Sequence, residues 1–233
     1  MNFPIVHCAV CGHNAFINEP VIWEGLIREW GLSPEQAAYV NRQQGTRCSR
    51  CQCNLRSMAL AKAVTRAFGY QGTFHRYLCS PRTWLRPVLE LNGAGTLQRY
   101  LKRLPRHTMG NFPEVDMQHL PFTDDRFDLV LHSDTLEHVP DPLAGLRECC
   151  RVLRPGGWCC YTIPIIPGRM SRSRAGLPPS YHGQVATSAS DFLVHTEYGS
   201  DCWEQVFEAG FDEFRLVTVE FPTAQAIAAR KPR

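Results

Sequence analysis

Two pairs of closely spaced cysteines stand near the start of the chain, Cys8-x-x-Cys11 and Cys48-x-x-Cys51. In such a turn both thiolates can point at one ion, and two turns complete the tetrahedral thiolate set of a structural zinc site. The 36 residues between the pairs exceed the usual spacing, but the cost of closing a loop grows slowly with its length. The spacing therefore predicts zinc bound by Cys8, Cys11, Cys48 and Cys51, with Cys53 as an alternative to Cys51.

A redox function is the other interpretation of these pairs. Thiol–disulfide motifs of this spacing occur in a βαβ context, and neither pair has one. The chain has eleven cysteines, and those beyond the first five lie in or near apparent strands and helices, where thiols are most simply small core hydrophobes. Zinc binding is the favoured interpretation.

A possible ligand-binding turn follows at residues 88–95. Glu90 lies near the end of a short apolar strand, and Gly93 and Gly95 allow the backbone to approach a ligand before a helix begins at Thr96. A strand, a glycine turn and a helix form the first unit of a doubly wound nucleotide-binding sheet. The glycines alone are weak support, but an acid at the end of a buried strand needs a partner or a ligand.

A group for ribose hydroxyls is expected about 20 residues after the glycine turn, at the end of a second strand. The count leads to Asn111, whose amide can bond hydroxyls although an acid is the usual choice. Further strands are expected at 127–131, 158–163, 214–219 and 224–229. Helices are expected after Ser33-Pro34 and Asn54, from Asp141-Pro142 to residue 153, and after Asp201, the last with Trp203, Val206 and Phe207 facing inward.

These elements suggest three segments. Residues 1–68 form a zinc-binding module whose last helix docks onto the rest, and 69–86, rich in glycine and proline, form a connector. Residues 87–233 form the main domain, in which 164–199 are a lid-like insertion, because loops of this length in compact domains are usually lids or binding elements.

The composition is that of an ordinary globular protein. Hydrophobic residues make up 44% of the 233 positions and charged residues 20%, and the net charge of +3 is too small to argue for nucleic acid. We expect no secretory signal and no membrane span, and hence a cytoplasmic protein.

In their order, the motifs resemble those of the class I S-adenosylmethionine-dependent methyltransferases, of the type 11-like kind. The resemblance covers residues 85–230 and rests on Glu90 with its glycine turn, Asp116 before Leu-Pro-Phe, Phe-Asp-Leu-Val at 127–130, Leu-Glu-His-Val at 136–139 and Arg-Val-Leu-Arg-Pro-Gly-Gly at 151–157. It extends to a subgroup with an N-terminal cysteine module, through residues 26–30, Arg56 and Tyr181-His182-Gly183. The fold implied is a Rossmann-like doubly wound α/β sheet.

The resemblance implies S-adenosylmethionine as the cofactor. It places Glu90, Asn92, Gly93 and Gly95 along the methionine and ribose side and Asn111 at the position of the ribose acid. It places Asp116 and Met117 against the adenine. The positions beside the sulfonium are His132, Ser133 and Asp134.

An oxygen or nitrogen acceptor needs a base with a pKa near neutrality, which favours histidine. His182, in the expected lid, and His132, after its strand, are the candidates, with His138 and His195 behind them. His138 is more simply a residue that orients its loop. Arg56 is either a contact for a substrate anion or a solvated helix residue.

The favoured function is methylation of a small-molecule or carbohydrate-type natural-product acceptor. A nucleic-acid methyltransferase is the alternative among enzymes, although residues 1–68 lack interleaved basic and aromatic residues. A zinc-bearing binding protein on a non-catalytic methyltransferase fold is the alternative outside enzymes. The acceptor and the oligomeric state do not follow from the sequence.

Overall fold

The computed structural model describes residues 5–181 and 192–233. Its elements are β1 (Phe16–Asn18), α1 (Glu24–Glu29), α2 (Pro34–Gly45), β2 (Thr46–Cys48), α3 (Leu55–Ala67), α4 (Phe74–Leu78), α5 (Pro81–Trp84), β3 (Val88–Leu91), η1 (Gly95–Leu97), α6 (Gln98–Leu101), β4 (His107–Gly110), β5 (Phe127–Ser133), η2 (Leu136–His138), α7 (Pro142–Val152), β6 (Leu153–Thr162), β7 (Arg172–Ser173), β8 (Thr196–Glu197), α8 (Glu204–Glu208), β9 (Glu213–Glu220) and β10 (Ala224–Arg230).

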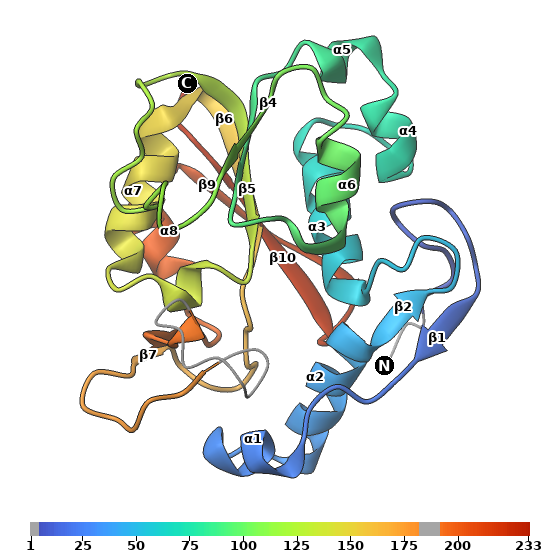
Figure 1. The fold of residues 1–233 in the computed structure, drawn as a ribbon, viewed down its shortest axis with the longest axis vertical. Helices are drawn as coiled ribbons and strands as arrows, with labels where there is room; N and C mark the ends of the chain where they lie inside the picture. Colours follow the sequence, from blue (N-terminus) through green and yellow to red (C-terminus); the bar gives the residue numbers. More distant parts are fainter. Residues whose placement is uncertain (1–4, 182–191) are drawn as a thin grey trace.

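The centre of the fold is a six-stranded sheet in the order β4-β3-β5-β6-β10-β9 (Figure 1). The strands β4, β3, β5 and β6 are parallel, and β10 runs antiparallel to both of its neighbours. The chain moves outward from β3 to β4 and then returns to the other side of β3 for β5 and β6. This reversal confirms the predicted Rossmann-like α/β fold and creates a crevice outside the carboxyl ends of β3 and β5.

Apolar side chains alternate between the two faces of the sheet and form two cores. Leu89, Val130 and Tyr161 belong to the core that the sheet shares with α7 and α8. Val88, Leu131 and Cys160 point the other way, to the core beneath α3, which packs on β6, β9 and β10. Burial on both faces explains why these strands read as near-continuous apolar runs.

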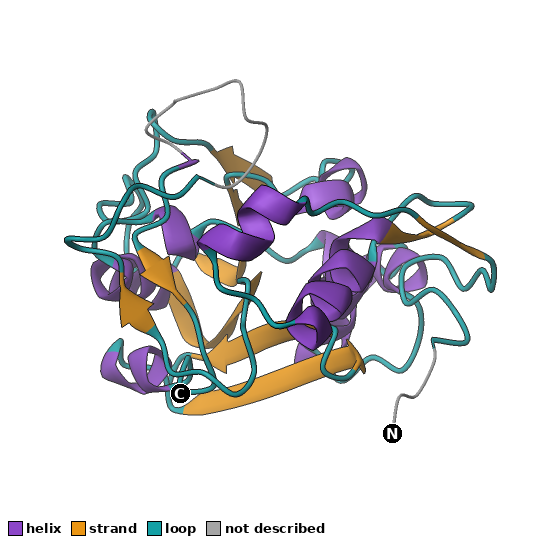
Figure 2. Ribbon diagram, turned by 90° about the horizontal axis from the view of Figure 1, so that it is seen from below, coloured by secondary structure: helices purple, strands orange, loops and turns teal. Residues whose placement is uncertain are grey.

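The cysteine-bearing segment is continuous with the second of these cores. Cys8, Cys48, Cys51 and Cys53 are buried in the same cluster as the apolar side of α3. The helix begins directly after them with Asn54 as its N-cap, as predicted. Figure 2 shows the β1–β2 ribbon of this segment at the end of the molecule opposite the C-terminus.

The helices α1 and α2, which lie between the two cysteine pairs, contact the insertion after β6. Leu26, Trp30 and Leu32 form a small core with Ile166. The Trp30 indole N–H donates to Ser180 Oγ at 3.1 Å. Arg169 donates to Trp30 O at 2.9 Å and to the Gln36 side-chain oxygen, also at 2.9 Å. The segment between the cysteine pairs and the insertion after β6 therefore pack together and are joined by hydrogen bonds.

The segment 69–86 carries two short helices, α4 and α5, because Thr73 caps the first and Ser80-Pro81 starts the second. Two expectations about the region of α8 are wrong. Asp201 does not cap α8 with its side chain, since its carboxylate accepts Ser171 N–H at 2.7 Å. Trp203 and Phe207 are 44% and 45% exposed rather than inward-facing.

The other expected helix caps and the closing pair of strands are confirmed. Ser33 and Gln36 form the capping box of α2, and Asp141 caps α7 by accepting Ala144 N–H at 3.0 Å. The closing pair β9–β10 is antiparallel. In the part of the chain that the structure describes, no helix is long and apolar enough to span a bilayer.

Candidate cofactor and cysteine sites

A cavity of about 800 Å³ lies at the carboxyl ends of β3, β4 and β5, in the crevice created by the reversal of the strand order. Among the residues that line it are several of the predicted cofactor positions, namely Asn92, Asn111, Asp116, Met117 and Asp134. Asn92, Asn111 and Asp134 each follow the last residue of one of these strands directly. Parallel register brings these three positions to one edge.

Glu90 holds the glycine turn and does not line this cavity. Its carboxylate is fully buried, accepts the Ala94 backbone N–H at 2.7 Å and lies 2.7 Å from His107 Nε2. Gly93 and Gly95 adopt φ of +83° and +55°, values that favour glycine. A Cβ on Gly95 would lie 3.3 Å from Ser57 Oγ of α3. The predicted acid and glycines therefore shape the turn.

Asn92 and Asp116 fix the other walls of the cavity. The Asn92 side-chain oxygen accepts Phe112 N–H at 2.7 Å, which ties the ends of β3 and β4 together. The Asp116 carboxylate accepts Gln118 N–H at 2.8 Å, and the Gln118 side-chain oxygen accepts Asp141 N–H at 3.0 Å. Met117 is buried beside Gly145 of α7. Hydrogen bonds and packing therefore connect these cavity walls to β3, β4 and α7.

Asp134 forms an ion pair with Arg56. The side chains are 20% and 16% exposed, so Arg56 is not a solvated helix residue. Burial lowers the pKa of Arg56 to about 10, partly offset by the negative charge of Glu137. The Asp134 backbone N–H donates to Thr162 O at 2.9 Å. The pair joins α3 to the carboxyl end of β5, where Asp134 lines the cavity.

His132 lies inside β5 rather than after it, because the strand continues to Ser133. Its ring is fully buried and stacks on Tyr161 with 4.8 Å between centroids. Burial lowers the pKa of His132 to about 4, with a smaller opposing effect of Glu137. Ser133 Oγ lies 2.8 Å from Thr162 Oγ1. Neither residue lines the cavity.

The other candidate histidines lie on the far wall. His138 Nδ1 donates to Leu193 O at 3.0 Å and so ties η2 to the insertion, while His195 lines the cavity beside Thr135 and Pro140. His182 falls outside the described residues. Sequence reasoning missed the apolar wall formed by Phe112, Val139, Phe192 and Leu193, because the pattern gives apolar cavity walls no signal different from that of the core.

The four predicted cysteine ligands come together. The four Sγ atoms all lie within 4.8 Å of one another; they belong to Cys8, Cys11, Cys48 and Cys51. Cys8 Sγ is 3.5 Å from Cys51 Sγ, and Cys11 Sγ is 3.6 Å from Cys48 Sγ. Four thiolates at about 2.3 Å from one tetrahedral ion would be about 3.8 Å apart, so the spacing suits zinc.

The two cysteine turns have the same backbone form. Gly12 N–H donates to Cys8 O at 2.8 Å and Gln52 N–H to Cys48 O at 2.9 Å. Gly12 and Gln52 both have positive φ, +81° and +54°. Cys53 lies outside the group of four and near the guanidinium of Arg99. The geometry therefore favours Cys51 over Cys53 as the fourth member.

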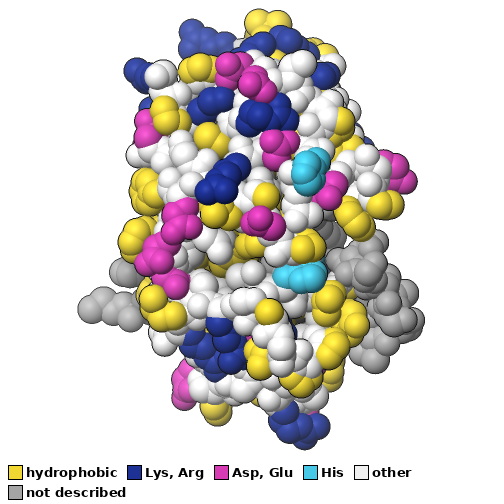
Figure 3. Space-filling view, turned by 90° about the vertical axis from the view of Figure 1, so that its left-hand side faces the viewer, with side chains coloured by type: hydrophobic (Ala, Val, Ile, Leu, Met, Phe, Trp, Pro, Cys, Tyr) yellow, Lys and Arg dark blue, Asp and Glu magenta, His cyan; other side chains and the backbone are white. Residues whose placement is uncertain are grey.

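Charged side chains of both signs lie on the surface. On the face drawn in Figure 3, acidic and basic side chains of the described residues are interspersed. This distribution agrees with the small net charge of +3.

Comparisons with known proteins find similarity to methyltransferases. Residues 71–161 match the family model described as a methyltransferase domain. The chain is 40% identical over 76 residues to a demethylmenaquinone methyltransferase of Clavibacter sepedonicus, which covers 31% of each chain. It is 40% identical over 57 residues to 2-methyl-6-phytyl-1,4-hydroquinone methyltransferase 1 of Oryza sativa subsp. japonica, covering 24% of this chain and 17% of that protein. The matches thus span less than a third of either relative.

Two solved structures are similar at low identity. A 1,6-didemethyltoxoflavin-N1-methyltransferase of Burkholderia thailandensis, with bound 1,6-didemethyltoxoflavin and S-adenosylhomocysteine, has a TM-score of 0.42 at 17% identity and covers 75% of this chain and 79% of its own. An S-adenosylmethionine-dependent methyltransferase of Mesorhizobium loti has a TM-score of 0.40 at 16% identity, covering 67% and 95%.

The sheet and the family match define the class of protein. Residues 71–161 form a methyltransferase domain on a Rossmann-like sheet, and the chain also carries an N-terminal cluster of four cysteines.

Proposed function

We propose that this chain binds S-adenosylmethionine in the cavity at the carboxyl ends of β3, β4 and β5 and methylates an oxygen or nitrogen atom of a small molecule. The observation that carries the proposal is the meeting of Asn92, Asn111 and Asp134 at the one edge where a doubly wound sheet binds its ligand. The two relatives are named for 2-methyl-6-phytyl-1,4-hydroquinone and demethylmenaquinone, neither of which is a macromolecule, and this supports a small-molecule acceptor.

The residues present fit the cofactor. The volume of about 800 Å³ lies within the range of small-molecule sites. Phe112, Met117 and Val139 offer apolar surface to a purine, and Asn111 offers an amide to ribose hydroxyls. When bound, the cofactor supplies an electrophilic methyl group, and its transfer leaves the electron pair of the carbon–sulfur bond on sulfur. The chain's own residues have to orient the acceptor and accept its proton.

Calorimetry with S-adenosylhomocysteine tests this proposal. Phe112→Ala removes an aromatic wall of the cavity and should weaken binding about tenfold, in line with the usual contribution of an aromatic ring stacked on a base. Phe221→Ala is the matched control, because Phe221 is also an exposed phenylalanine before a proline and does not line the cavity. An absence of binding at millimolar ligand would refute the proposal and favour a non-catalytic protein.

We further propose that Cys8, Cys11, Cys48 and Cys51 bind one structural zinc ion. The sulfur spacing, the matching turns and the all-thiolate donor set support a closed site. In this arrangement zinc fixes the start of α3 and hence the position of Arg56.

A further inference from the structure

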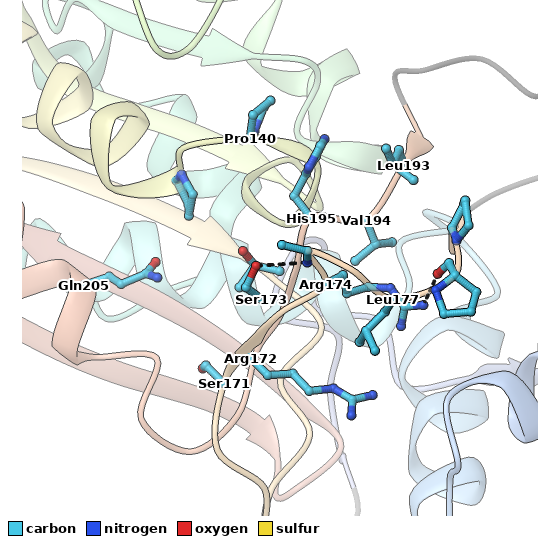
Figure 4. Close-up of a pocket in the computed structure, with 15 residues that line it drawn as sticks. Pro140, Ser171, Arg172, Ser173, Arg174, Leu177, Leu193, Val194, His195 and Gln205 are labelled. Atoms are coloured by element: carbon cyan, nitrogen blue, oxygen red, sulfur yellow. Dashed lines mark hydrogen bonds between the residues drawn. The ribbon is translucent and has the colours of Figure 1, made fainter.

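A second cavity, of about 530 Å³, lies between the insertion and the N-terminus of α7 (Figure 4). Its lining is mostly apolar, with Pro140, Pro142, Leu177, Pro178, Pro179 and Val194. Its size and lining are those of a small-molecule site. It uses none of the residues that follow β3 and β4, so it is distinct from the proposed cofactor cavity.

The two cavities share one wall. Pro140, Leu193 and His195 line both of them. In Figure 4 His195 lies between Pro140 and Arg174. A molecule in the second cavity can therefore present a group to the first only past these side chains. An acceptor held in the second cavity would therefore have to meet its methyl donor beside these three side chains.

The backbone of His195 is held firmly on both sides. Its N–H donates to Glu137 O of η2 at 2.7 Å, and its carbonyl accepts Arg174 N–H at 2.9 Å. No hydrogen bond to the His195 ring is present among the described residues, and the ring lines both cavities, so the imidazole is available to a ligand from either one. Firm placement of the backbone with an available ring nitrogen suits a base that acts on an acceptor.

The charges of the second cavity favour an anion. Arg172 donates to Glu197 Oε2 at 2.8 Å, and Arg174 pairs with the other oxygen of the same carboxylate. Burial acts to raise the pKa of Glu197, but the two arginines outweigh it and the pKa is lowered, which keeps the carboxylate ionised. The Asp201 carboxylate, which accepts the N–H of the lining residue Ser171, offsets part of the remaining positive charge. Arg172, whose side chain is 53% exposed, can still pair with the carboxylate of an acceptor.

We propose that the second cavity binds the methyl acceptor and that the acceptor is a small hydroxylated aromatic carboxylic acid. Its ring packs on the proline-rich walls and its carboxylate lies towards Arg172 and Arg174. Its hydroxyl points at His195, whose imidazole nitrogen takes the proton as the oxygen receives the methyl group. This assignment rests on the proposed methyltransferase function.

Binding of 4-hydroxybenzoate to the zinc-loaded full chain, measured by calorimetry with S-adenosylhomocysteine present, tests the assignment. Leu177→Trp fills the second cavity and should weaken 4-hydroxybenzoate at least about tenfold while the affinity for S-adenosylhomocysteine stays the same. Leu216→Trp is the matched control, because Leu177 and Leu216 are both 43% exposed and only Leu177 lines the cavity.

Two further variants separate charge from proton transfer. Arg172→Gln should lower the affinity for 4-hydroxybenzoate about fivefold. The variant should then bind 4-hydroxybenzoate no more tightly than it binds methyl 4-hydroxybenzoate, which lacks the charge. His195→Gln should leave the affinity within about threefold but raise the pH at which the bound phenol ionises by about one unit, followed by ultraviolet absorbance, because the imidazole no longer stabilises the phenolate.

The outcomes distinguish the two proposals. If S-adenosylhomocysteine does not bind, the proposed function fails. If it binds but 4-hydroxybenzoate does not, or if Leu177→Trp leaves 4-hydroxybenzoate unaffected, the acceptor assignment is overturned. Equal binding of tyramine would overturn the preference for an anion, and an unchanged ionisation of the phenol in His195→Gln would exclude His195 as the base.

Discussion

The guanidinium of Arg56 is paired with the carboxylate of Asp134, so the first turn of α3 is joined to the carboxyl end of β5. The helix begins just after Cys51 and Cys53, and Asp134 lines the proposed cofactor cavity. One ion pair therefore joins the helix that follows the cysteine cluster to a residue that lines the proposed cofactor cavity.

Arg56→Gln should weaken S-adenosylhomocysteine about tenfold and destabilise the fold by about 3 kcal/mol, because removal of one partner leaves a largely buried charge without its counter-charge. Calorimetry and urea unfolding measure the two effects. Arg66→Gln on the exposed side of the same helix is the control and should change neither. Wild-type affinity in Arg56→Gln would show that the ion pair has no role in shaping the cavity.

Local signals predicted the elements around this pair well. The Asn54 cap, the Asp141-Pro142 start and the apolar runs of β3 and β5 depend on neighbouring residues only, and all are present. The contact of Arg56 with Asp134 joins positions 78 residues apart, and nothing in the local pattern of either one specifies it.

The sequence predicted those residues of the candidate site that directly follow a strand. Asn92, Asn111 and Asp134 reach the cavity because parallel register places strand ends together. Glu90 does not, because its strand directs the side chain to His107 and the glycine turn. His195 received less weight than His132 because the sequence does not show how the insertion folds back, with β7 pairing to β8.

Cys48→Ser should abolish zinc binding, whereas Cys53→Ser should retain about one zinc per chain, as measured by elemental analysis. The cluster is part of the core beneath α3, so metal loss should also lower the melting temperature by about 10 °C, given a loss of about 4 kcal/mol in a chain of this size. Cys79→Ser, at an exposed cysteine, is the control. Retention of zinc by Cys48→Ser would disprove the four-cysteine site.

His132 should make the stability depend on pH. Its folded pKa of about 4 lies below the unfolded value of 6.5, so between these limits the unfolded chain binds a proton that the folded chain does not. The contribution is fully present above pH 6.5 and is lost as the pH falls towards 4, by up to about 3 kcal/mol.

His132→Phe keeps a ring stacked on Tyr161 and removes the titrating group. Its free energy of unfolding should fall less steeply than that of the wild type between pH 6.5 and 4, as followed by urea unfolding at several pH values. His75→Phe, at an exposed histidine, should keep the wild-type slope. Equal slopes in all three proteins would mean that His132 is not held neutral in the fold. If His132→Phe bound its ligands normally but lost methyl transfer, His132 would again be a candidate catalytic residue.

Asn111→Asp should strengthen S-adenosylhomocysteine about fivefold, because an ionised acceptor forms stronger hydrogen bonds with ribose hydroxyls than a neutral amide does. Asn111 follows β4 directly and lines the cavity, so the new carboxylate would lie at the edge where the sugar is expected. Asn111→Leu, which keeps the size but removes both polar atoms, should weaken binding about tenfold. Competition between S-adenosylhomocysteine and its 2′-deoxy analogue locates the effect, since the gain in Asn111→Asp should shrink for the ligand without that hydroxyl. An equal gain for both ligands would place Asn111 away from the ribose and move the nucleoside towards Asp116.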